Sequence, residues 1–359
     1  MSFAFLRTIG FRNLIDAETD LRSKDVFLIG ENGQGKSNFL EALYFCSYAS
    51  SFRGVGDKDL VRNGEKDCSA SLTLNASIHS KVSVAYNEGK KSISLDGKKV
   101  EDRKELLSVA PAIVFCHEDM GFVAGSTERR RWFFDQTRSL WDHLYLDDLR
   151  KYRHVLKSRN AVLKKGPGHN EDTLDALDLQ LVRYGLELIV KRRKTAEEFS
   201  LVFEPLYREI SGIAGIGVKY IPSWKKENPE EIITLLGEKR EADLSVGVSL
   251  SGPHRDRYLF TREEEEFSGK ASTGQRRLLA LLLRIAQALT FTEKTGKNPV
   301  FLLDDVLLEL DGEKRRKFIS VMPEYEQAFF TFLPVEPYEM YRKPDTIVYH
   351  MNCGQVKPI

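Results

Sequence analysis

The sequence predicts an α/β fold in which a mainly helical insertion interrupts an α/β lobe. Three observations support this prediction. The first third of the chain is rich in strand-like segments and holds a glycine-rich loop between a buried strand and a helix. Between residues 126 and 244 apolar side chains recur at helical spacing, and after residue 245 strand and helix patterns alternate again. We therefore expect residues 1–125 and 245–359 to be the two parts of one lobe, and residues 126–244 to form the insertion.

Composition narrows the class of protein. The 359 residues are 42% hydrophobic and 30% charged, which excludes disordered and collagen-like chains. Lys and Arg number 54 against 53 Asp and Glu, which excludes a histone-like polycation but not a local basic face. The sequence shows no apolar run of the ~20 residues that a membrane span needs and no signal peptide. Four scattered Cys without a C-x-x-C pair favour a reducing compartment. We expect a cytoplasmic protein without a membrane partner.

Apolar and alternating patterns predict the strands of the first third. The expected strands are Phe3–Phe11, Val26–Ile29, Ser69–Ala76, Lys81–Tyr86 and Ala112–Cys116. Asp96-Gly97 follows an apolar stretch and is a strong hairpin signal, because both residues tolerate the positive φ that such a turn requires.

Helical spacing dominates the insertion. Apolar residues recur at Leu140, Leu144, Leu149, Tyr152 and Leu156, and again at Leu177, Leu181, Tyr184 and Leu188. A Gly-Pro break at residues 164–168 separates two long helices. Asn228-Pro229 followed by two Glu predicts a further helix start. In the last part we expect a helix after Ser272, a strand at Val300–Leu303, a helix from Asp311 and a strand at Ala328–Phe332.

One segment predicts a phosphate site. It reads Gly30-Glu31-Asn32-Gly33-Gln34-Gly35-Lys36-Ser37 and matches G-x-x-x-x-G-K-[ST] in full. The glycines let backbone N–H groups point at a phosphate, and the helix that follows adds its dipole. Lys36 would reach the β- and γ-phosphate oxygens and Ser37 would ligate Mg²⁺. The alternative is an ordinary glycine turn, but the strand and helix on either side favour binding of ATP with Mg²⁺.

A second motif lies at the end of a buried strand. Val300–Leu303 leads into Asp304 and Asp305. Asp304 would hold Mg²⁺, usually through water. Asp305 would orient or deprotonate the attacking water as the catalytic base. The alternative is a strand that runs into an acidic loop.

Between these motifs, Ser272-Thr273-Gly274-Gln275 begins an apolar helix. Ser272 and Gln275 have the spacing of a capping box. The same exposed helix start suits a γ-phosphate sensor formed by Ser272, Gly274 and Gln275. A P-loop, Ser-x-Gly-Gln and an acidic strand end, in this order, resemble the ABC/SMC-type ATPases, in which the Ser-x-Gly-Gln of one subunit closes over ATP held by another.

The whole chain resembles one family, the RecF recombination-repair proteins. The matching elements are Gly10–Leu14, the extended P-loop through Ala42, Ser51-Phe52-Arg53, Glu118-Asp119 through Asp135, Gly252-Pro253-His254-Arg255-Asp256, and Leu303–Val306 with Glu309-Leu310-Asp311. The resemblance implies an ABC/SMC-head-like P-loop ATPase lobe without a long coiled coil. It also implies an ATP-dependent homodimer on DNA, slow ATP hydrolysis, and action with RecR and RecO to load RecA onto gapped DNA in repair and the SOS response.

The same resemblance implies roles for further residues. Arg12 would lie near the base or ribose, although a surface charge is the alternative. Glu118 and Asp119 would lie near the metal or cap a short helix, and His254 and Arg255 would face the dimer interface or mark a turn. The chain departs from the family pattern where His117, Thr127, Arg257 and Leu308 stand and in the short acidic stretch Glu263–Glu266.

A basic stretch in the insertion is the candidate DNA surface. Between residues 129 and 165, eleven Lys or Arg stand against four Asp, a net charge of +7, and Lys191–Lys194 add a second cluster. The candidate DNA contacts are Arg150, Lys151, Arg153, Lys157 and Arg159. The alternative is a solvated helical face.

Other functions remain open at the level of the motifs. A transporter's nucleotide-binding subunit is disfavoured by the lack of Ser-Gly-Gly-Gln, and an SMC-type nuclease by the short segment after Asp305. An ATPase subunit that acts as a scaffold or energy-coupling module without clamping DNA is the main alternative to an ATP-controlled DNA clamp.

Overall fold

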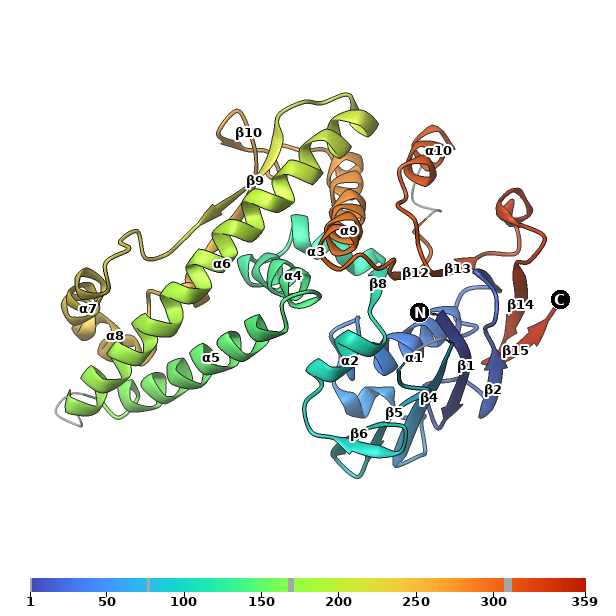
Figure 1. Cartoon of the computed structure of the whole chain (residues 1–359), viewed down its shortest axis with the longest axis horizontal. Coiled ribbons are helices and arrows are strands. Elements are labelled where there is room, and N and C mark those ends of the chain that lie inside the picture. Colours follow the sequence, from blue (N-terminus) through green and yellow to red (C-terminus); the bar gives the residue numbers. More distant parts are fainter. Residues whose placement is uncertain (1, 76–77, 167–170, 307–311) are drawn as a thin grey trace. The chain divides into compact units, whose positions relative to one another are not determined.

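The computed structural model describes residues 2–75, 78–166, 171–306 and 312–359 (Figure 1). The chain divides into two compact units. Unit 1 comprises the residues up to Asp119 together with Phe291–Ile359, and unit 2 comprises Met120–Thr290. The second boundary falls inside helix α9 (Thr273–Thr295).

Residues 120–125 fall in unit 2 and not in the first part of the lobe, and the larger difference from the expected segments lies at residues 245–290. The sequence pattern grouped them with the second part of the ATPase lobe, whereas they pack in unit 2. The reason is a strand pairing that sequence patterns do not show. Strand β10 (Arg257–Arg262) pairs antiparallel with β9 (Ile216–Ile221), and both Tyr258 and Phe260 are buried.

Unit 1 contains a mostly parallel six-stranded sheet. Its order is β15 (Gln355–Pro358), β14 (Ile347–Asn352), β3 (Asp25–Ile29), β13 (Gln327–Phe332), β12 (Val300–Leu303) and β8 (Ala112–Phe115). All residues of β3, β8 and β12 are buried, as expected for parallel strands covered on both faces. Strands β14 and β15 were not among the strands expected from the sequence. Because β3 and β12 run parallel, their carboxyl ends reach the same edge of the sheet.

The second sheet of unit 1 is antiparallel. Its order is β2 (Ala17–Asp20), β1 (Ser2–Ile9), β4 (Asp67–Asn75), β5 (Lys81–Asn87), β6 (Lys90–Leu95) and β7 (Lys98–Val100). Burial alternates along β4, so one face of the sheet packs inward. The predicted hairpin turn is confirmed between β6 and β7, where Asp96 and Gly97 both have positive φ.

Helices complete unit 1. They are α1 (Lys36–Tyr48), α2 (Lys104–Val109) and α10 (Gly312–Ser320). Nearly every residue of α1 is buried. Both of its sides are covered, because α1 contacts β4 and β5 of one sheet and β8 and β13 of the other.

Unit 2 is mainly helical. Its helices are α3 (Met120–Val123), α4 (Thr127–Ser139), α5 (His143–Leu163), α6 (Glu171–Ser211), α7 (Pro229–Glu238), α8 (Arg240–Val246) and α9, and β9, β10 and β11 (Glu265–Glu266) form a small sheet. The two long helices predicted around the break at residues 164–168 are confirmed as α5 and α6. Asn228 caps α7 through a 2.8 Å hydrogen bond from the Glu230 amide, also as predicted.

A core shared by α5, α6 and α7 holds unit 2 together. It gathers Tyr145, Leu149, Tyr152, Leu181, Leu188, Trp224 and Ile232. The close approach of the indole requires a glycine in α6, because a Cβ at Gly185 would lie 2.5 Å from the Trp224 ring.

Candidate nucleotide-binding site

The P-loop leaves strand β3 and ends where α1 begins. Gly33 and Gly35 take positive φ of 79° and 108°, which residues with a Cβ rarely adopt. A Cβ at Gly30 would lie 2.5 Å from the carbonyl oxygen of Met351 in β14. The loop therefore needs its glycines for conformation and for packing, and it delivers the chain directly into the N-terminus of α1.

Lys36 is buried, and its ammonium lies within the loop. Its Nζ donates to the carbonyl oxygens of Gly30 at 2.7 Å and Glu31 at 3.2 Å. A phosphate bound to the loop would meet a lysine already held at its base.

The side chain of Gln34 has a structural role. Its Oε1 accepts a 2.6 Å hydrogen bond from the Cys353 amide, and its carbonyl oxygen accepts one of 2.9 Å from Gly354. These contacts attach the P-loop to the turn between β14 and β15. Glu31 and Asn32 are exposed on the same loop.

Ser37, the second residue of α1, lies near Asp304, the residue that follows β12. Burial raises the pKa of Asp304 to about 6, and the nearby Asp305 and Glu118 charges act in the same direction. Hydroxyl and carboxylate oxygens are the ligands that Mg²⁺ prefers, so this pair fits the predicted metal site.

Asp305 is held by the neighbouring strand. Its backbone φ is 54°, and its amide donates a 2.8 Å hydrogen bond to Oγ1 of Thr331 in β13. The Thr331 hydroxyl in turn lies 2.8 Å from Asp305 Oδ1. The candidate base therefore has a defined orientation.

Arg12 is engaged by a buried acid. Its guanidinium makes two hydrogen bonds, of 2.9 and 3.1 Å, to the carboxylate of Glu41 in α1. The neighbouring Asn13 donates to the Gly33 carbonyl at 3.2 Å, which ties this segment to the P-loop. The contact of Arg12 with a nucleotide stays a prediction.

Arg53 is a site residue that the motif analysis did not assign. Its Nη1 donates to Asn38 Oδ1 at 3.0 Å and lies 3.8 Å from Glu41. Its charge also lowers the pKa of Asp304 against the effect of burial. The Ser51-Phe52-Arg53 element was the available signal.

Two acids after β8 have different positions. Asp119 is buried, and its Oδ2 accepts a 3.1 Å hydrogen bond from the Cys116 amide, as a capping residue does. Glu118 is partly buried and close enough to Asp304 to raise its pKa.

The Ser-x-Gly-Gln segment belongs to unit 2. Ser272 and Gln275 form the predicted capping box, with the Ser272 amide 2.8 Å from Gln275 Oε1 and the Gln275 amide 3.3 Å from Ser272 Oγ. Ser272, Thr273 and Gly274 are exposed at the start of α9. The capping role leaves the helix start open to a ligand or a partner.

His254 makes its polar contacts inside unit 2. Its Nε2 lies 2.9 Å from the Ser249 carbonyl oxygen, and its Nδ1 lies 2.7 Å from the Tyr152 hydroxyl. A carbonyl only accepts, so Nε2 carries the hydrogen and Nδ1 accepts from Tyr152. Burial lowers the pKa of His254 to about 4. Arg255 is exposed.

The candidate DNA contacts on α5 divide into two groups. Arg150, Arg153 and Lys157 are exposed and lie within about 60° of arc on one helix face. Lys151 is exposed on a different side of the helix, with its ammonium 5.9 Å from the ring centre of Tyr184. Arg150, Arg153 and Lys157 form what we call the α5 basic face.

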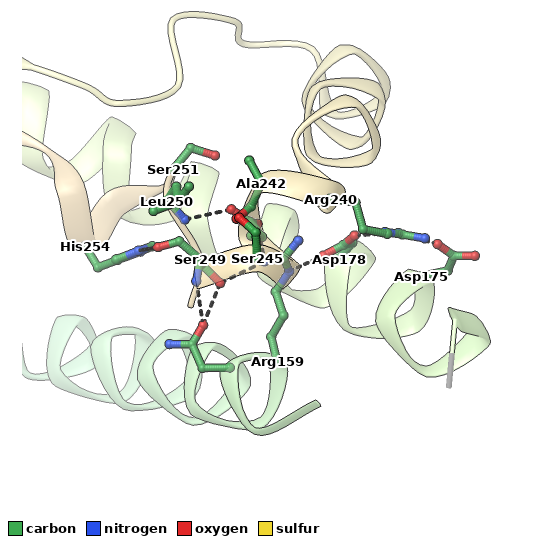
Figure 2. Close-up of polar contacts among 12 residues, drawn as sticks. Arg159, Asp175, Asp178, Arg240, Ala242, Ser245, Ser249, Leu250, Ser251 and His254 are labelled. Atoms are coloured by element: carbon green, nitrogen blue, oxygen red, sulfur yellow. Dashed lines mark hydrogen bonds and ion pairs between the residues drawn. The ribbon is translucent and has the colours of Figure 1, made fainter. Parts of the chain in front are cut away.

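Arg159 was wrongly predicted as a DNA contact. It is fully buried, and helical spacing places it on the side of α5 opposite the basic face. Figure 2 shows its side chain reaching from α5 toward Asp178 and Ser249. Its Nε donates to Asp178 at 2.5 Å, and its Nη1 donates to Asp243 at 2.6 Å and to Ser249 at 2.8 Å. A guanidinium used in this way cannot reach a phosphate backbone.

Not every basic side chain of the insertion is available at the surface. Arg192, from the second basic cluster, is buried against Asp135 and Asp256 at 2.8 and 2.9 Å. Lys191 pairs with Asp148 at 2.6 Å. Burial and pairing thus reduce the number of basic side chains of the insertion that are available to an anionic partner.

Some of the residues that depart from the family pattern have defined positions in the structure. The acidic stretch Glu263–Glu266 forms the β10–β11 hairpin, where Arg130 pairs with Glu266 at 3.3 Å and Lys270 with Glu265 at 2.5 Å. Arg257 is exposed at the start of β10. Leu308 and the Glu309-Leu310-Asp311 motif lie outside the described residues.

Within the described ranges, no helix is long and apolar enough to cross a bilayer.

Comparisons with known proteins agree with these motifs. The RecF/RecN/SMC N-terminal domain family matches residues 4–351. The DNA replication and repair protein RecF of Treponema pallidum (strain Nichols) is 41% identical over 351 residues, covering 97% of this chain and 99% of that protein. RecF of Clostridium perfringens (strain 13 / Type A) is 31% identical over 358 residues, covering 98% of each chain.

Solved structures confirm the expected ABC/SMC-head-like fold. The structure described as the recombination mediator protein RecF-ATP in the RecFOR pathway has a TM-score of 0.89 at 27% identity and covers 99% of this chain and 97% of that one. The Smc head domain of Pyrococcus furiosus, at 16% identity and a TM-score of 0.53, covers 99% of this chain and 95% of that one and shares the fold.

Proposed function

The chain belongs to the RecF family, and on that premise we propose that it is an ATP-dependent DNA-binding protein of recombinational repair and of the rescue of replication gaps. The observation that carries the proposal is the proximity of Ser37 to Asp304. It brings together the P-loop and the acidic end of β12, the two motifs that would hold a nucleotide and its metal ion.

In the proposed ATP site each group has one task. The amides of residues 30–35 bind the β-phosphate, and Lys36 binds the β- and γ-phosphate oxygens. Ser37 and Asp304 hold Mg²⁺, and Asp305 accepts the proton of the attacking water. Hydrolysis is weak and resets a conformational switch.

We propose that ATP joins two copies of the chain. Ser272, Gly274 and Gln275 of one copy close over the ATP bound to the P-loop of the other. This proposal is supported by the exposed capping box at the start of α9 and by its membership of a different unit from the P-loop. The dimer would clamp gapped, single-stranded or double-stranded DNA.

The α5 basic face is the proposed DNA contact. Its Arg and Lys side chains carry charge without a base-reading motif, so they would bind phosphates. The similar solved structures are described as members of the RecFOR pathway. We propose that this chain likewise works with RecO and RecR in the cytoplasm to load RecA during repair and the SOS response.

Sedimentation of the full chain tests the switch. With saturating ATP and Mg²⁺ the chain should sediment as a dimer and bind gapped DNA more tightly than without nucleotide, whereas Lys36→Ala should stay monomeric. A chain that remains monomeric at saturating ATP would refute the clamp. DNA binding that is absent with and without ATP, in a chain that still dimerises, would favour the scaffold alternative.

A further inference from the structure

Thr331 occupies a buried position beside the two acids that follow β12. It lies in β13, is 4% exposed, and comes directly after Phe330, which pairs with Leu303 in the parallel register. The register therefore brings Thr331 level with the point where the chain leaves β12 and enters the acidic pair.

The hydroxyl of Thr331 makes a reciprocal contact with Asp305. It accepts from the Asp305 amide at 2.8 Å and lies 2.8 Å from Asp305 Oδ1. A hydroxyl has one hydrogen to donate. Its other acceptors are more distant, with Asp304 Oδ1 at 3.4 Å and the Leu303 carbonyl oxygen at 3.5 Å. The hydrogen therefore points to Asp305.

Asp305 needs such a restraint. Its φ of 54° is left-handed, a region that residues with a Cβ seldom occupy, although Asp tolerates it better than most. The amide contact holds the backbone in this region, and the contact with Oδ1 fixes the rotation of the carboxylate. One threonine thus restrains both parts of the same residue.

We propose that Thr331 is a positioning residue that holds Asp305 in the orientation from which it activates the attacking water. This inference rests on the proposed role of Asp305 as the base. The β-branched side chain suits the task, because its χ1 is restricted within a strand. A catalytic base misplaced by about 1 Å loses on the order of 100-fold in rate, so the orientation is worth maintaining.

Another buried polar residue of β13 has a different role. Gln327 bonds to backbone groups of Phe3, Leu21 and Ser23, and so connects separate segments of unit 1. Among the described residues, the hydroxyl of Thr331 makes its hydrogen bonds with the end of β12 and the two acids that follow it. Its loss should therefore affect the rate of hydrolysis more than the fold.

ATP hydrolysis by the full chain with Mg²⁺ and DNA tests the inference. Thr331→Val keeps the shape of the side chain and removes the hydroxyl. We expect kcat to fall roughly 10- to 100-fold while KM for ATP stays within about twofold, and Thr331→Ser to restore kcat to within about threefold. An unchanged kcat in Thr331→Val, or a loss that appears only in KM, would overturn the proposal. If the valine variant fails to fold, as judged by its thermal unfolding, Thr331→Ala is read by the same criteria.

A double-mutant comparison separates this inference from the proposed function. If Thr331 acts through Asp305, Thr331→Val should cause no further loss of kcat in an Asp305→Asn background. An equal loss in both backgrounds would overturn the positioning role. Wild-type hydrolysis by Asp305→Asn alone would instead refute the base assignment, and with it the proposed mechanism.

Discussion

Replacing Arg159 by methionine separates a role in folding from a role in DNA binding. Methionine keeps the length and apolar stem of the side chain but removes the guanidinium. In unit 2 this guanidinium joins α5 to Asp178 in α6 and to Asp243 in α8 (Figure 2). All three side chains are almost completely buried, so water cannot replace the lost contacts.

The loss of stability in Arg159→Met depends on the contacts that Asp178 and Asp243 keep. Asp178 keeps its 2.9 Å contact with Arg240, whereas within the described part of the chain the Asp243 carboxylate keeps one hydrogen bond, of 3.0 Å, from the Leu250 amide. Removing one partner of a buried ion pair costs about 3–5 kcal/mol of unfolding free energy. For a unit of this size, that loss lowers Tm by about 6–20 °C.

Thermal unfolding of the full chain without nucleotide measures the loss. Lys157→Met is the matched control, because Lys157 is exposed on the same helix and should change Tm by less than about 2 °C. Combining Arg159→Met with Asp243→Leu should recover part of the loss, since no unpaired charge then stays buried at Asp243. An unchanged Tm in Arg159→Met together with weakened DNA binding would refute the reasoning and restore Arg159 as a DNA contact.

Three further outcomes follow from the structure. Replacing Arg150, Arg153 and Lys157 together by alanine should reduce the slope of log K against log salt for binding of duplex DNA by about 2.7. Alanine at the exposed Lys194, Arg208 and Lys239 should leave this slope unchanged. Equal slopes for both triple variants would exclude the α5 basic face as the DNA contact. Asp305→Asn should lower ATP turnover roughly 100-fold or more and keep the ATP-bound dimer on DNA, and turnover at the wild-type rate would contradict the base assignment. Burial lowers the pKa of His254 to about 4, so between pH about 6.5 and 4 the unfolded chain binds a proton at His254 that the folded chain does not. The free energy of unfolding, measured by denaturant titration, should therefore fall as the pH is lowered through this window. It should fall less in His254→Gln.

Features set by neighbouring residues were predictable from the sequence. The P-loop, the Asp96-Gly97 hairpin and the Asn228 cap each depend on a few consecutive residues, whose conformational preferences are strong. Their predicted positions agree with the structure because little tertiary information is needed to form them.

Features set by residues far apart in the chain were not predictable from the sequence. The pairing of β9 with β10 draws residues 245–290 into unit 2, and no local pattern announces it. The binding of Gln34 to the turn at Cys353 is equally non-local.

The burial of Arg159 had a local signal that charge counting overlooked. Tyr145, Leu149, Tyr152 and Leu163 are buried on one side of α5, and Arg159 falls on that side at helical spacing. A basic residue in the apolar phase of a helix indicates a buried ion pair more often than a surface contact.

The position of β14 bears on how the protein is made. This strand lies beside β3, pairing His350 with Ile29 at the entrance to the P-loop, and the turn that follows it binds Gln34. During synthesis the P-loop emerges from the ribosome more than 300 residues earlier than these partners. A nascent chain that ends before about residue 354 therefore lacks the contacts that Met351, Cys353 and Gly354 make with the P-loop, and the loop gains this support only late in translation.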